Sequence, residues 1–367
     1  MALREGYTTG TCAAAAAKAA AIFLAEKICV SQVKVTGPTG REFLIDVFKI
    51  AENKFGAVKD AGDDVDITNG MTVCASLEIL NDLNLNNNVN NKDKIIFEAG
   101  EGVGVITLPG MKLPAGEAAI NPGPRTMIAN ALREVLGEDI CVKVIISIPG
   151  GAEKAQHTFN PRLGVKGGLS VLGTTGVVKP MDEAALIASL DLELSVIYSL
   201  GVRDLIITFG NTGELAVRKA FNINEEDRCI IQAGNYIGHV LDEAARLGFK
   251  RCLVAGHPGK LLKVTAGSFY THNRAADGRL EALCTHAALN GVKLDIIKEL
   301  YNCRTTENAI EIINREGLNY LWQALAEVTA RRCENRNFGE LPAAAAFINN
   351  DGVILGAANG TENFKRR

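Results

Sequence analysis

Four glycine-rich turns carry the residue types from which a nucleoside-binding pocket can be built. They follow short apolar runs and read Gly173-Thr174-Thr175-Gly176, Gly210-Asn211-Thr212-Gly213, Gly234-Asn235-Tyr236-Ile237-Gly238 and Gly256-His257-Pro258-Gly259-Lys260. Glycine lacks a Cβ, so backbone N–H and carbonyl groups can approach a ligand directly. An adjacent asparagine amide can donate to and accept from an adenine edge or a ribose. Four such turns on successive elements favour a pocket over tight packing alone.

Phosphate-binding motifs do not fit these turns. A P-loop ending at Lys260 would need Gly at position 254 and Ser or Thr at 261, where Val254 and Leu261 stand. The run that begins at Gly100 misses the dinucleotide fingerprint, because Val105 holds the place of its last glycine. A ligand without phosphates, such as S-adenosylmethionine, stays compatible with the turns.

A second group of charged and titratable residues, which could bind a ligand or take part in catalysis, spans positions 257–279. It contains His257, Lys260, Lys263, His272, Arg274, Asp277 and Arg279. A solvated helix face would explain single cations here, but two histidines around a glycine-interrupted segment favour a pocket edge. Metal binding is disfavoured, because the histidines stand fifteen residues apart with no third ligand at the usual spacing.

Nucleophilic catalysis and disulfide scaffolds find no support. There is no G-x-S-x-G elbow, and the only cysteine placed before a helix, Cys12, is followed by alanines. The nine cysteines form no C-x-x-C pair. This usage predicts free thiols in a reducing cytoplasm.

A helix is predicted directly after the threonines near the N-terminus. Thr8, Thr9 and Thr11 precede an alanine run and offer caps to a helix that we expect to last until about Lys27. Its N-terminus could hold a ligand carboxylate, or the small side chains could simply pack tightly in a core.

The elements up to residue 150 predict an α+β domain with an antiparallel or mixed sheet. Short strands broken by turns run from Val33 to Leu80, and an Asn-rich loop follows at residues 81–91. A helix is expected from Pro122 to Leu136, and a strand from Val142 to Ile148. Pro149-Gly150-Gly151 then suggests the domain boundary.

From residue 151 to 367 the rhythm becomes strand, glycine turn, helix. The expected strands are Leu169 to Leu172, Leu205 to Phe209, Ile230 to Ala233 and Cys252 to Ala255, and a closing hairpin spans Phe347 to Leu355. This alternation predicts a Rossmann-like α/β domain with a mainly parallel sheet and helices from Arg279 to about Arg332. Ligands bind at the carboxyl ends of such strands, so all four glycine turns are expected on one rim.

Composition excludes several classes. With 47% hydrophobic and 22% charged residues, a net charge of -3 and a pI near 6.0, the chain is expected to be soluble and not to bind nucleic acid. Lys18 interrupts the N-terminal alanine run, which rules out a signal-peptide core, and no stretch is apolar enough for a membrane span. We therefore expect a cytoplasmic protein that binds a small molecule.

Several motifs together resemble the CbiD family. They are Gly6-Tyr7-Thr8-Thr9-Gly10-Thr11-Cys12, Asn121-Pro122-Gly123-Pro124-Arg125, the run from Asn160 to Gly168, the run from Leu172 to Met181, Gly210-Asn211, Gly234-Asn235 and residues 257–279. The resemblance extends over nearly the whole chain, and the combination is highly specific.

The resemblance implies S-adenosylmethionine-dependent methylation of C-1 of cobalt-precorrin-5B, giving cobalt-precorrin-6A in anaerobic cobalamin biosynthesis. It also implies that the cobalt belongs to the tetrapyrrole substrate and that the protein carries no metal of its own. Alignment of the two reactants would be the main task of the protein.

These implications assign provisional roles to the residues. The cofactor-binding candidates are Gly173, Thr174, Thr175, Gly176, Gly210, Asn211, Gly213, Gly234, Asn235 and Gly238. Substrate-binding candidates are Thr8, Thr9, Thr11, Arg125, Arg162, Lys166, Lys260, Lys263, Arg274 and Arg279, because a macrocycle rich in carboxylates needs dispersed cations and helix N-termini. His257 and His272 are the catalytic candidates, either moving a proton or orienting a carboxylate.

Two other functions stay open. A nicotinamide-dependent reductase could use the same crevice, although the dinucleotide fingerprint fails. A non-catalytic tetrapyrrole-binding module would differ by transferring no methyl group. The sequence does not fix the oligomeric state, and a homo-oligomer stays open.

Overall fold

The computed structural model describes residues 3–80, 95–138, 141–180 and 182–365. The chain forms two compact units, residues 1–186 and 187–367. The Asn-rich loop expected at residues 81–91 lies outside the described residues. Mixed α/β architecture, as predicted, is present in both units.

The first unit is built on a five-stranded mixed sheet. Its strand order is β4 (Phe48–Ala51), β5 (Lys54–Val58), β6 (Thr72–Ile79), β9 (Val142–Ser147) and β7 (Ile95–Ala99). Neighbouring strands are antiparallel except β7 and β9, which run parallel. A separate antiparallel pair joins β2 (Gln32–Thr36) to β3 (Glu42–Asp46).

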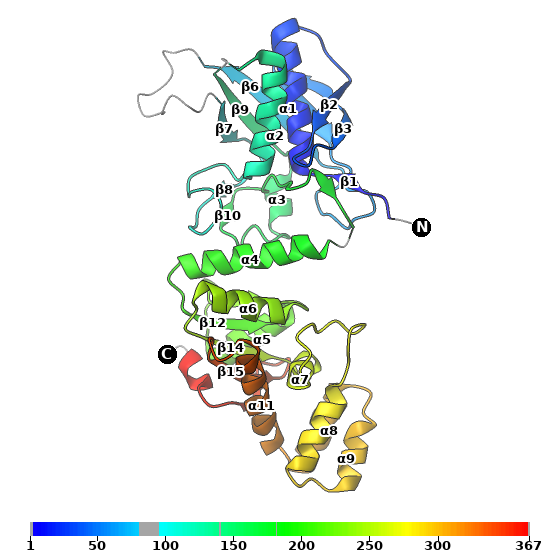
Figure 1. The fold of residues 1–367 in the computed structure, drawn as a ribbon, viewed down its shortest axis with the longest axis vertical. Helices are drawn as coiled ribbons and strands as arrows, with labels where there is room; N and C mark the ends of the chain where they lie inside the picture. Colours follow the sequence, from blue (N-terminus) through cyan, green and yellow to red (C-terminus); the bar gives the residue numbers. More distant parts are fainter. Residues whose placement is uncertain (1–2, 81–94, 139–140, 181, 366–367) are drawn as a thin grey trace. The chain divides into compact units, whose positions relative to one another are not determined.

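Helices α1 (Thr9–Glu26) and α2 (Pro122–Leu136) cover one face of this sheet (Figure 1). The Thr8 hydroxyl accepts the Thr11 N–H and caps α1, as the sequence predicted. The alanines of α1 from Ala13 to Ala21 are almost wholly buried, because methyl side chains allow α2 and the sheet to approach closely. A Cβ on Gly10 would lie 2.7 Å from the Pro124 ring of α2, so glycine is required there.

Residues 151–180 stay in the first unit, so the division falls at residue 186 rather than at 150. After the short helix α3 (Gly151–Ala155), β10 (Val165–Lys166) pairs with β8 (Val105–Ile106), and β11 (Val177–Val178) pairs with β1 (Gly6–Tyr7). The strand expected at residues 169–172 makes only isolated bridges and is not part of a parallel sheet. Gly150 adopts φ 77°, so the Pro-Gly-Gly sequence makes a turn within the unit.

The second unit is built on a mainly parallel sheet. Its order is β13 (Ile230–Gln232), β12 (Asp204–Thr208), β14 (Arg251–Gly256), β15 (Ala343–Ile348) and β16 (Ile354–Ala357). All pairs are parallel except β15 with β16, which forms the expected closing hairpin. The finer description as Rossmann-like remains a prediction.

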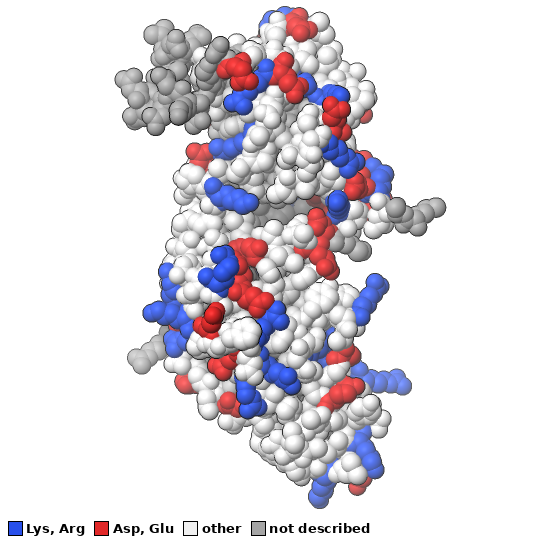
Figure 2. All heavy atoms as spheres, in the orientation of Figure 1, with Lys and Arg blue, Asp and Glu red and all other residues white. Residues whose placement is uncertain are grey.

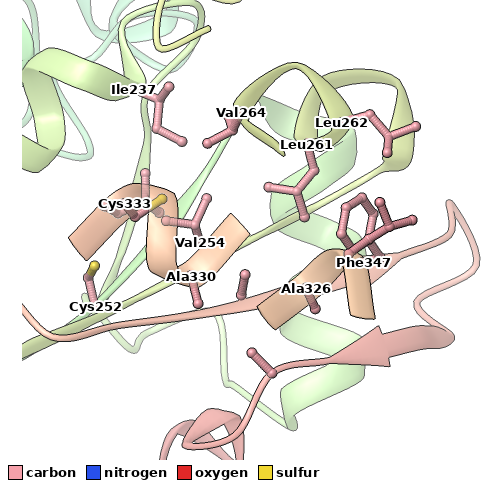
Figure 3. Packing of buried hydrophobic residues seen from close by; sticks show 14 of the residues in the cluster. Ile237, Cys252, Val254, Leu261, Leu262, Val264, Ala326, Ala330, Cys333 and Phe347 are labelled. Carbon is pink, nitrogen blue, oxygen red and sulfur yellow. The ribbon is translucent and has the colours of Figure 1, made fainter. Parts of the chain in front are cut away.

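Helices cover both faces of this sheet because its strands alternate between two cores. On β14, Cys252 and Val254 face one core, whereas Leu253 and Ala255 face the other. The first core contains α6 (Ile237–Leu247), α7 (Pro258–Thr265), α11 (Tyr320–Arg336) and the end of α4 (Glu183–Ser199); Figure 3 shows part of it. The second contains α5 (Asn211–Phe221) and the 3-10 helix η2 (Thr361–Phe364).

Three further helices follow α7. They are α8 (Arg279–Leu289), α9 (Leu294–Tyr301) and α10 (Thr306–Arg315). In the described part of the chain, no helix is both long and apolar enough to cross a bilayer. On the face shown in Figure 2, acidic and basic side chains lie interspersed on each unit.

The strand order creates a switch point at the carboxyl edge of the second sheet. From β12 the chain passes to β13 on one side, whereas from β14 it passes to β15 on the other. The two connections therefore diverge, and the rule for open parallel sheets predicts a ligand-binding crevice between the carboxyl ends of β12 and β14.

Candidate functional site

Three of the four predicted glycine turns meet at this edge. Gly210 follows β12, Gly234 follows β13 and His257 follows β14, and these strands are hydrogen-bonded neighbours. Side chains also join the turns. Gln232 Nε2 donates to Asn211 Oδ1 at 2.9 Å, and Lys260 Nζ donates to Asn235 Oδ1 at 2.6 Å.

The glycines at this edge fall into two kinds. A Cβ built on Gly210 or Gly234 would meet no atom within 4 Å, so both border open space. A Cβ on Gly213 would lie 2.7 Å from Thr208 Oγ1, and one on Gly256 would lie 2.8 Å from the Phe209 ring. Gly210 and Gly234 therefore leave room for a ligand, whereas Gly213 and Gly256 allow close packing.

Thr208, the last residue of β12, carries a buried hydroxyl at the carboxyl end of its strand. Its Oγ1 is buried and has no hydrogen-bond partner. It lies between the Cβ positions of Gly213 and Gly256, at 2.7 Å and 3.8 Å. A buried hydroxyl without a partner costs about 1–3 kcal/mol, and a polar ligand atom could remove that cost.

The fourth glycine turn, Gly173 to Gly176, lies in the first unit, which corrects the expectation of one shared rim. It packs on the start of α1, where Thr11 Oγ1 donates to Gly176 O at 2.8 Å and Thr9 Oγ1 donates to Leu172 O at 3.2 Å. Gly173 is needed for packing, because its Cβ would lie 2.3 Å from Thr8 Oγ1. Glycine turns that allow ligand approach and those that allow chain packing look alike in sequence.

A carboxylate site was predicted at the start of α1, and contacts of the same kind occupy that helix N-terminus. Gly10 N donates to Leu172 O at 2.8 Å, and Thr8, Thr9 and Thr11 are all buried. The chain itself therefore satisfies this helix N-terminus, and these threonines hold the 172–176 segment in place.

His257 is the N-cap of α7, and each of its ring nitrogens faces a polar partner. Nδ1 accepts the Gly259 N–H at 3.2 Å, and Nε2 lies 3.4 Å from Glu307 Oε1. Because Nδ1 acts as an acceptor, we assign the proton of the neutral ring to Nε2, which faces Glu307. Burial lowers the pKa of His257, and the charge of Glu307 opposes this.

Glu307 was not predicted from the sequence. It stands in the first turn of α10, which the Thr305 hydroxyl caps by accepting the Asn308 N–H. The cap signals a helix start, but no sequence pattern links it to His257. Within the described ranges, His, Cys, Asp and Glu residues form no group of three or more that could hold a metal ion.

Lys260 and Lys263 share one neutral acceptor, the carbonyl of Thr271, at 3.2 Å each. Lys263 is fully buried and also donates to Asn273 Oδ1 at 2.7 Å and to Ala276 O at 3.1 Å. Burial lowers the pKa of both ammonium groups. Lys263 is thus enclosed and anchors the 271–276 loop, whereas Lys260 is half-buried at the edge.

The remaining predicted cations are divided between the units. Arg274 is exposed, and its N–H donates to His272 Nδ1 at 3.1 Å, while Arg279 forms a two-point ion pair with Asp277. Arg125, Arg162 and Lys166 lie in the first unit. Arg125 is engaged there by Glu117 and by the carbonyls of Ile120 and Ala118.

Comparisons with known proteins show the family of this chain. The family profile described as CbiD matches residues 1–180, and that of the CbiD C-terminal domain matches residues 270–359. Cobalt-precorrin-5B C(1)-methyltransferase of Citrobacter koseri is 38% identical over 97% of this chain and 93% of its own. The relative of the same name from Tolumonas auensis is 40% identical over 91% of this chain and 85% of its own.

A solved structure also matches, the cobalamin biosynthesis protein (cbiD) from Archaeoglobus fulgidus. It is 30% identical, covers 79% of this chain and 85% of its own, and gives a TM-score of 0.40. By fold, this is a mixed α/β protein whose glycine turns border the open edge of a mainly parallel sheet. By its sequence matches, the chain belongs to the CbiD family.

Proposed function

We propose that this protein is an S-adenosylmethionine-dependent C-methyltransferase that acts on C-1 of cobalt-precorrin-5B. The product would be cobalt-precorrin-6A in anaerobic cobalamin biosynthesis, with cobalt carried in the substrate. The observation that carries the proposal is the match, at 38–40% identity over more than nine-tenths of this chain, to relatives with that name.

The crevice of the second unit suits the methyl donor. Gly210 and Gly234 border open space, and Asn211 and Asn235 place amides beside it. The Thr208 hydroxyl, buried without a partner, offers both a donor and an acceptor. These residues fit a nucleoside without phosphates, and S-adenosylmethionine would supply a methyl group on a positively charged sulfur.

The cations of the 260–279 segment suit the carboxylates of the macrocycle. Lys260 and Arg274 have no ion-pair partner among the described residues. Their charge is therefore available to an anionic ligand.

The two histidines would orient rather than exchange protons. In His257 and His272, Nδ1 accepts a backbone N–H, so Nε2 of each neutral ring is a donor. In the proposal, His272 directs a substrate carboxylate and His257 holds the start of α7 beside Glu307. Alignment of this kind is the main requirement for a displacement at an already activated carbon.

The direct test is methyl transfer by the purified protein. Cobalt-precorrin-5B and S-adenosylmethionine with a ¹³C-labelled methyl group are incubated with it, and NMR of the corrin product locates the label. Label at C-1 is expected. The Citrobacter koseri relative serves as the positive control. Unchanged substrate with this protein, in an assay where the relative is active, would contradict the proposal.

A further inference from the structure

Three aromatic rings stand in a row at the carboxyl edge of the second sheet. Tyr236 precedes α6, and Tyr270 and His272 lie between α7 and α8. The ring centroids of Tyr236 and Tyr270 are 5.4 Å apart with planes inclined by 51°, and those of Tyr270 and His272 are 6.1 Å apart with planes inclined by 17°. Tyr270 is 37% exposed, although it is large and apolar in its ring. We call these three residues the aromatic row.

The backbone fixes the aromatic row in place. Thr271 N donates to Asn235 O at 3.0 Å, and Gly238 N donates to Phe269 O at 3.0 Å. The segment that carries Tyr270 is therefore hydrogen-bonded on both sides of that residue to the start of α6. His272 is further held by the Arg274 N–H on its Nδ1. Rings held in this way lose little conformational entropy when a ligand packs on them.

Positive charge borders the row. Lys260 Nζ donates to Asn235 Oδ1 and to the carbonyl of Thr271, the residue between Tyr270 and His272 in the chain. The buried ammonium of Lys263 donates to the same carbonyl. Across the described residues, no carboxylate lies within ion-pair distance of either lysine. Two cations on one neutral acceptor favour the approach of an anion.

The dimensions and the charge together select one ligand class. A nucleobase covers about one aromatic side chain, whereas a row of three rings suits an extended conjugated system. The adjoining cations suit a ring system that carries carboxylates. The nucleoside of the methyl donor already has a fitting place at Gly210 and Gly234, next to β12 and β13.

We propose that Tyr236, Tyr270 and His272 form the surface on which the conjugated macrocycle of a tetrapyrrole packs, with Lys260 facing one of its carboxylates. The choice of a tetrapyrrole rests on the proposed function. The roles assigned are binding and positioning, and no bond to the protein is formed.

Tyr270→Leu tests the proposal, with uroporphyrin as the probe because it is a planar tetrapyrrole that carries carboxylates. The change in its main absorption band on titration gives the affinity. Tyr270→Leu should weaken binding about fivefold to tenfold, the loss typical of one aromatic contact, whereas Tyr270→Phe should retain wild-type affinity. Tyr320→Leu is the matched control, since Tyr320 is 48% exposed and its hydroxyl lies near Asn290, beyond the far end of α8.

A second titration, calorimetry with S-adenosylhomocysteine, separates the two ligands. Affinity for it should be the same in all four proteins. Equal uroporphyrin affinity in the wild type and Tyr270→Leu would overturn the proposal. So would weaker binding of S-adenosylhomocysteine alone, which would assign the row to adenine.

Methyl transfer by the wild type distinguishes this proposal from the proposed function. Uroporphyrin binding that depends on Tyr270, without any methyl transfer to cobalt-precorrin-5B, would refute the enzyme activity and leave the aromatic row as a tetrapyrrole site. Methyl transfer with the same KM for the corrin in the wild type and Tyr270→Leu would refute the role of the row alone.

Discussion

At the residue scale, the imidazole of His257 caps helix α7 and also contacts Glu307 at the edge of the candidate site. Its Nδ1 accepts the Gly259 N–H that starts α7, and its Nε2 lies beside Glu307. Protonation would place a hydrogen on Nδ1, facing the Gly259 N–H, and would remove the cap. Burial lowers the pKa of the ring below its ordinary value of 6.5, in spite of the nearby carboxylate.

This lowered pKa predicts a loss of stability in mild acid. The unfolded chain takes up the proton first as pH falls through about 6.5, so the folded state is favoured above that pH and loses this advantage below it. His257→Asn keeps an acceptor oxygen and does not titrate. Its urea midpoint should therefore fall less than that of the wild type between about pH 7.5 and pH 5.5. His286, whose pKa burial also lowers, titrates in both proteins, and equal falls would show that His257 contributes nothing.

Gly210 allows a test of the crevice without strain. Its φ of 173° is extended backbone that any residue adopts, and a Cβ there meets nothing within 4 Å. Gly210→Val should leave the thermal midpoint unchanged but occupy space needed by the methyl donor, which should weaken S-adenosylhomocysteine binding roughly tenfold or more. Calorimetry measures it, with the exposed Leu215→Val on the same helix as control. Wild-type affinity in Gly210→Val would move the donor site elsewhere.

Asn211 gives a second test of the same pocket. Its Oδ1 accepts from Gln232, which leaves its amide nitrogen for a ligand. Asn211→Ala should weaken S-adenosylhomocysteine binding by about fivefold, the worth of one hydrogen bond. Unchanged affinity in calorimetry would exclude Asn211 from the site.

At the scale of elements, the start of α1 shows glycines and threonines used for packing. Thr11 is fully buried, and its hydroxyl donates to Gly176 O. Thr11→Val keeps the shape but removes this donor, so the free energy of unfolding should fall by about 1–2 kcal/mol. Urea unfolding followed by circular dichroism measures this. Thr126→Val, an exposed change on α2, is the control and should have little effect; equal losses in both variants would contradict the assigned role.

Elements with local signals were predictable from the sequence. Proline near the first turn and Gly137 after the last residue define α2, which spans Pro122–Leu136 as predicted. The apolar runs that became β12, β13 and β14 were also found, because each is bounded by turn residues. The segment after Gly150 was assigned to the wrong sheet, because its short strands pair with distant β1 and β8, and such pairing leaves no local pattern.

The candidate site was predictable to a similar degree. The turns at Gly210, Gly234 and His257 follow adjacent parallel strands, and the rule for such sheets brings them to one edge. Glu307 and the exposed ring of Tyr270 reach that edge through helix packing and loop hydrogen bonds. Lys263 was predicted as a substrate-binding cation, and its burial was not foreseen, because the three oxygen acceptors that allow it lie on a loop that folds back over α7.

At the scale of the whole molecule, each unit has its own hydrophobic core. Buried residues of α1, α2 and the first sheet form one cluster, and the second sheet has a cluster on each face. The single tryptophan, Trp322, is fully buried in the second unit and packs against Phe347 at 5.5 Å between ring centroids. Its fluorescence therefore reports the folding of that unit alone.

This division predicts that residues 182–367 fold as an independent fragment. Such a fragment keeps the whole of α4, because the Asp182 carboxylate accepts the Ala184 N–H at 3.0 Å and caps that helix. It also keeps Thr208, Gly210, Asn211, Gly234 and Asn235. We expect cooperative urea unfolding with buried tryptophan emission, and S-adenosylhomocysteine affinity within about twofold of the full chain.

The fragment lacks Gly173 to Gly176, so it also decides between the two places considered for the methyl donor. If the folded fragment binds S-adenosylhomocysteine like the full chain, the crevice between β12 and β14 is sufficient, and the 173–176 turn serves α1 alone. A fragment with a cooperative transition and no affinity, beside a full chain that binds, would instead show that the donor needs residues before 182. Fragment unfolding followed by Trp322 makes that outcome interpretable, because loss of binding through misfolding would appear in the same sample as exposed tryptophan emission.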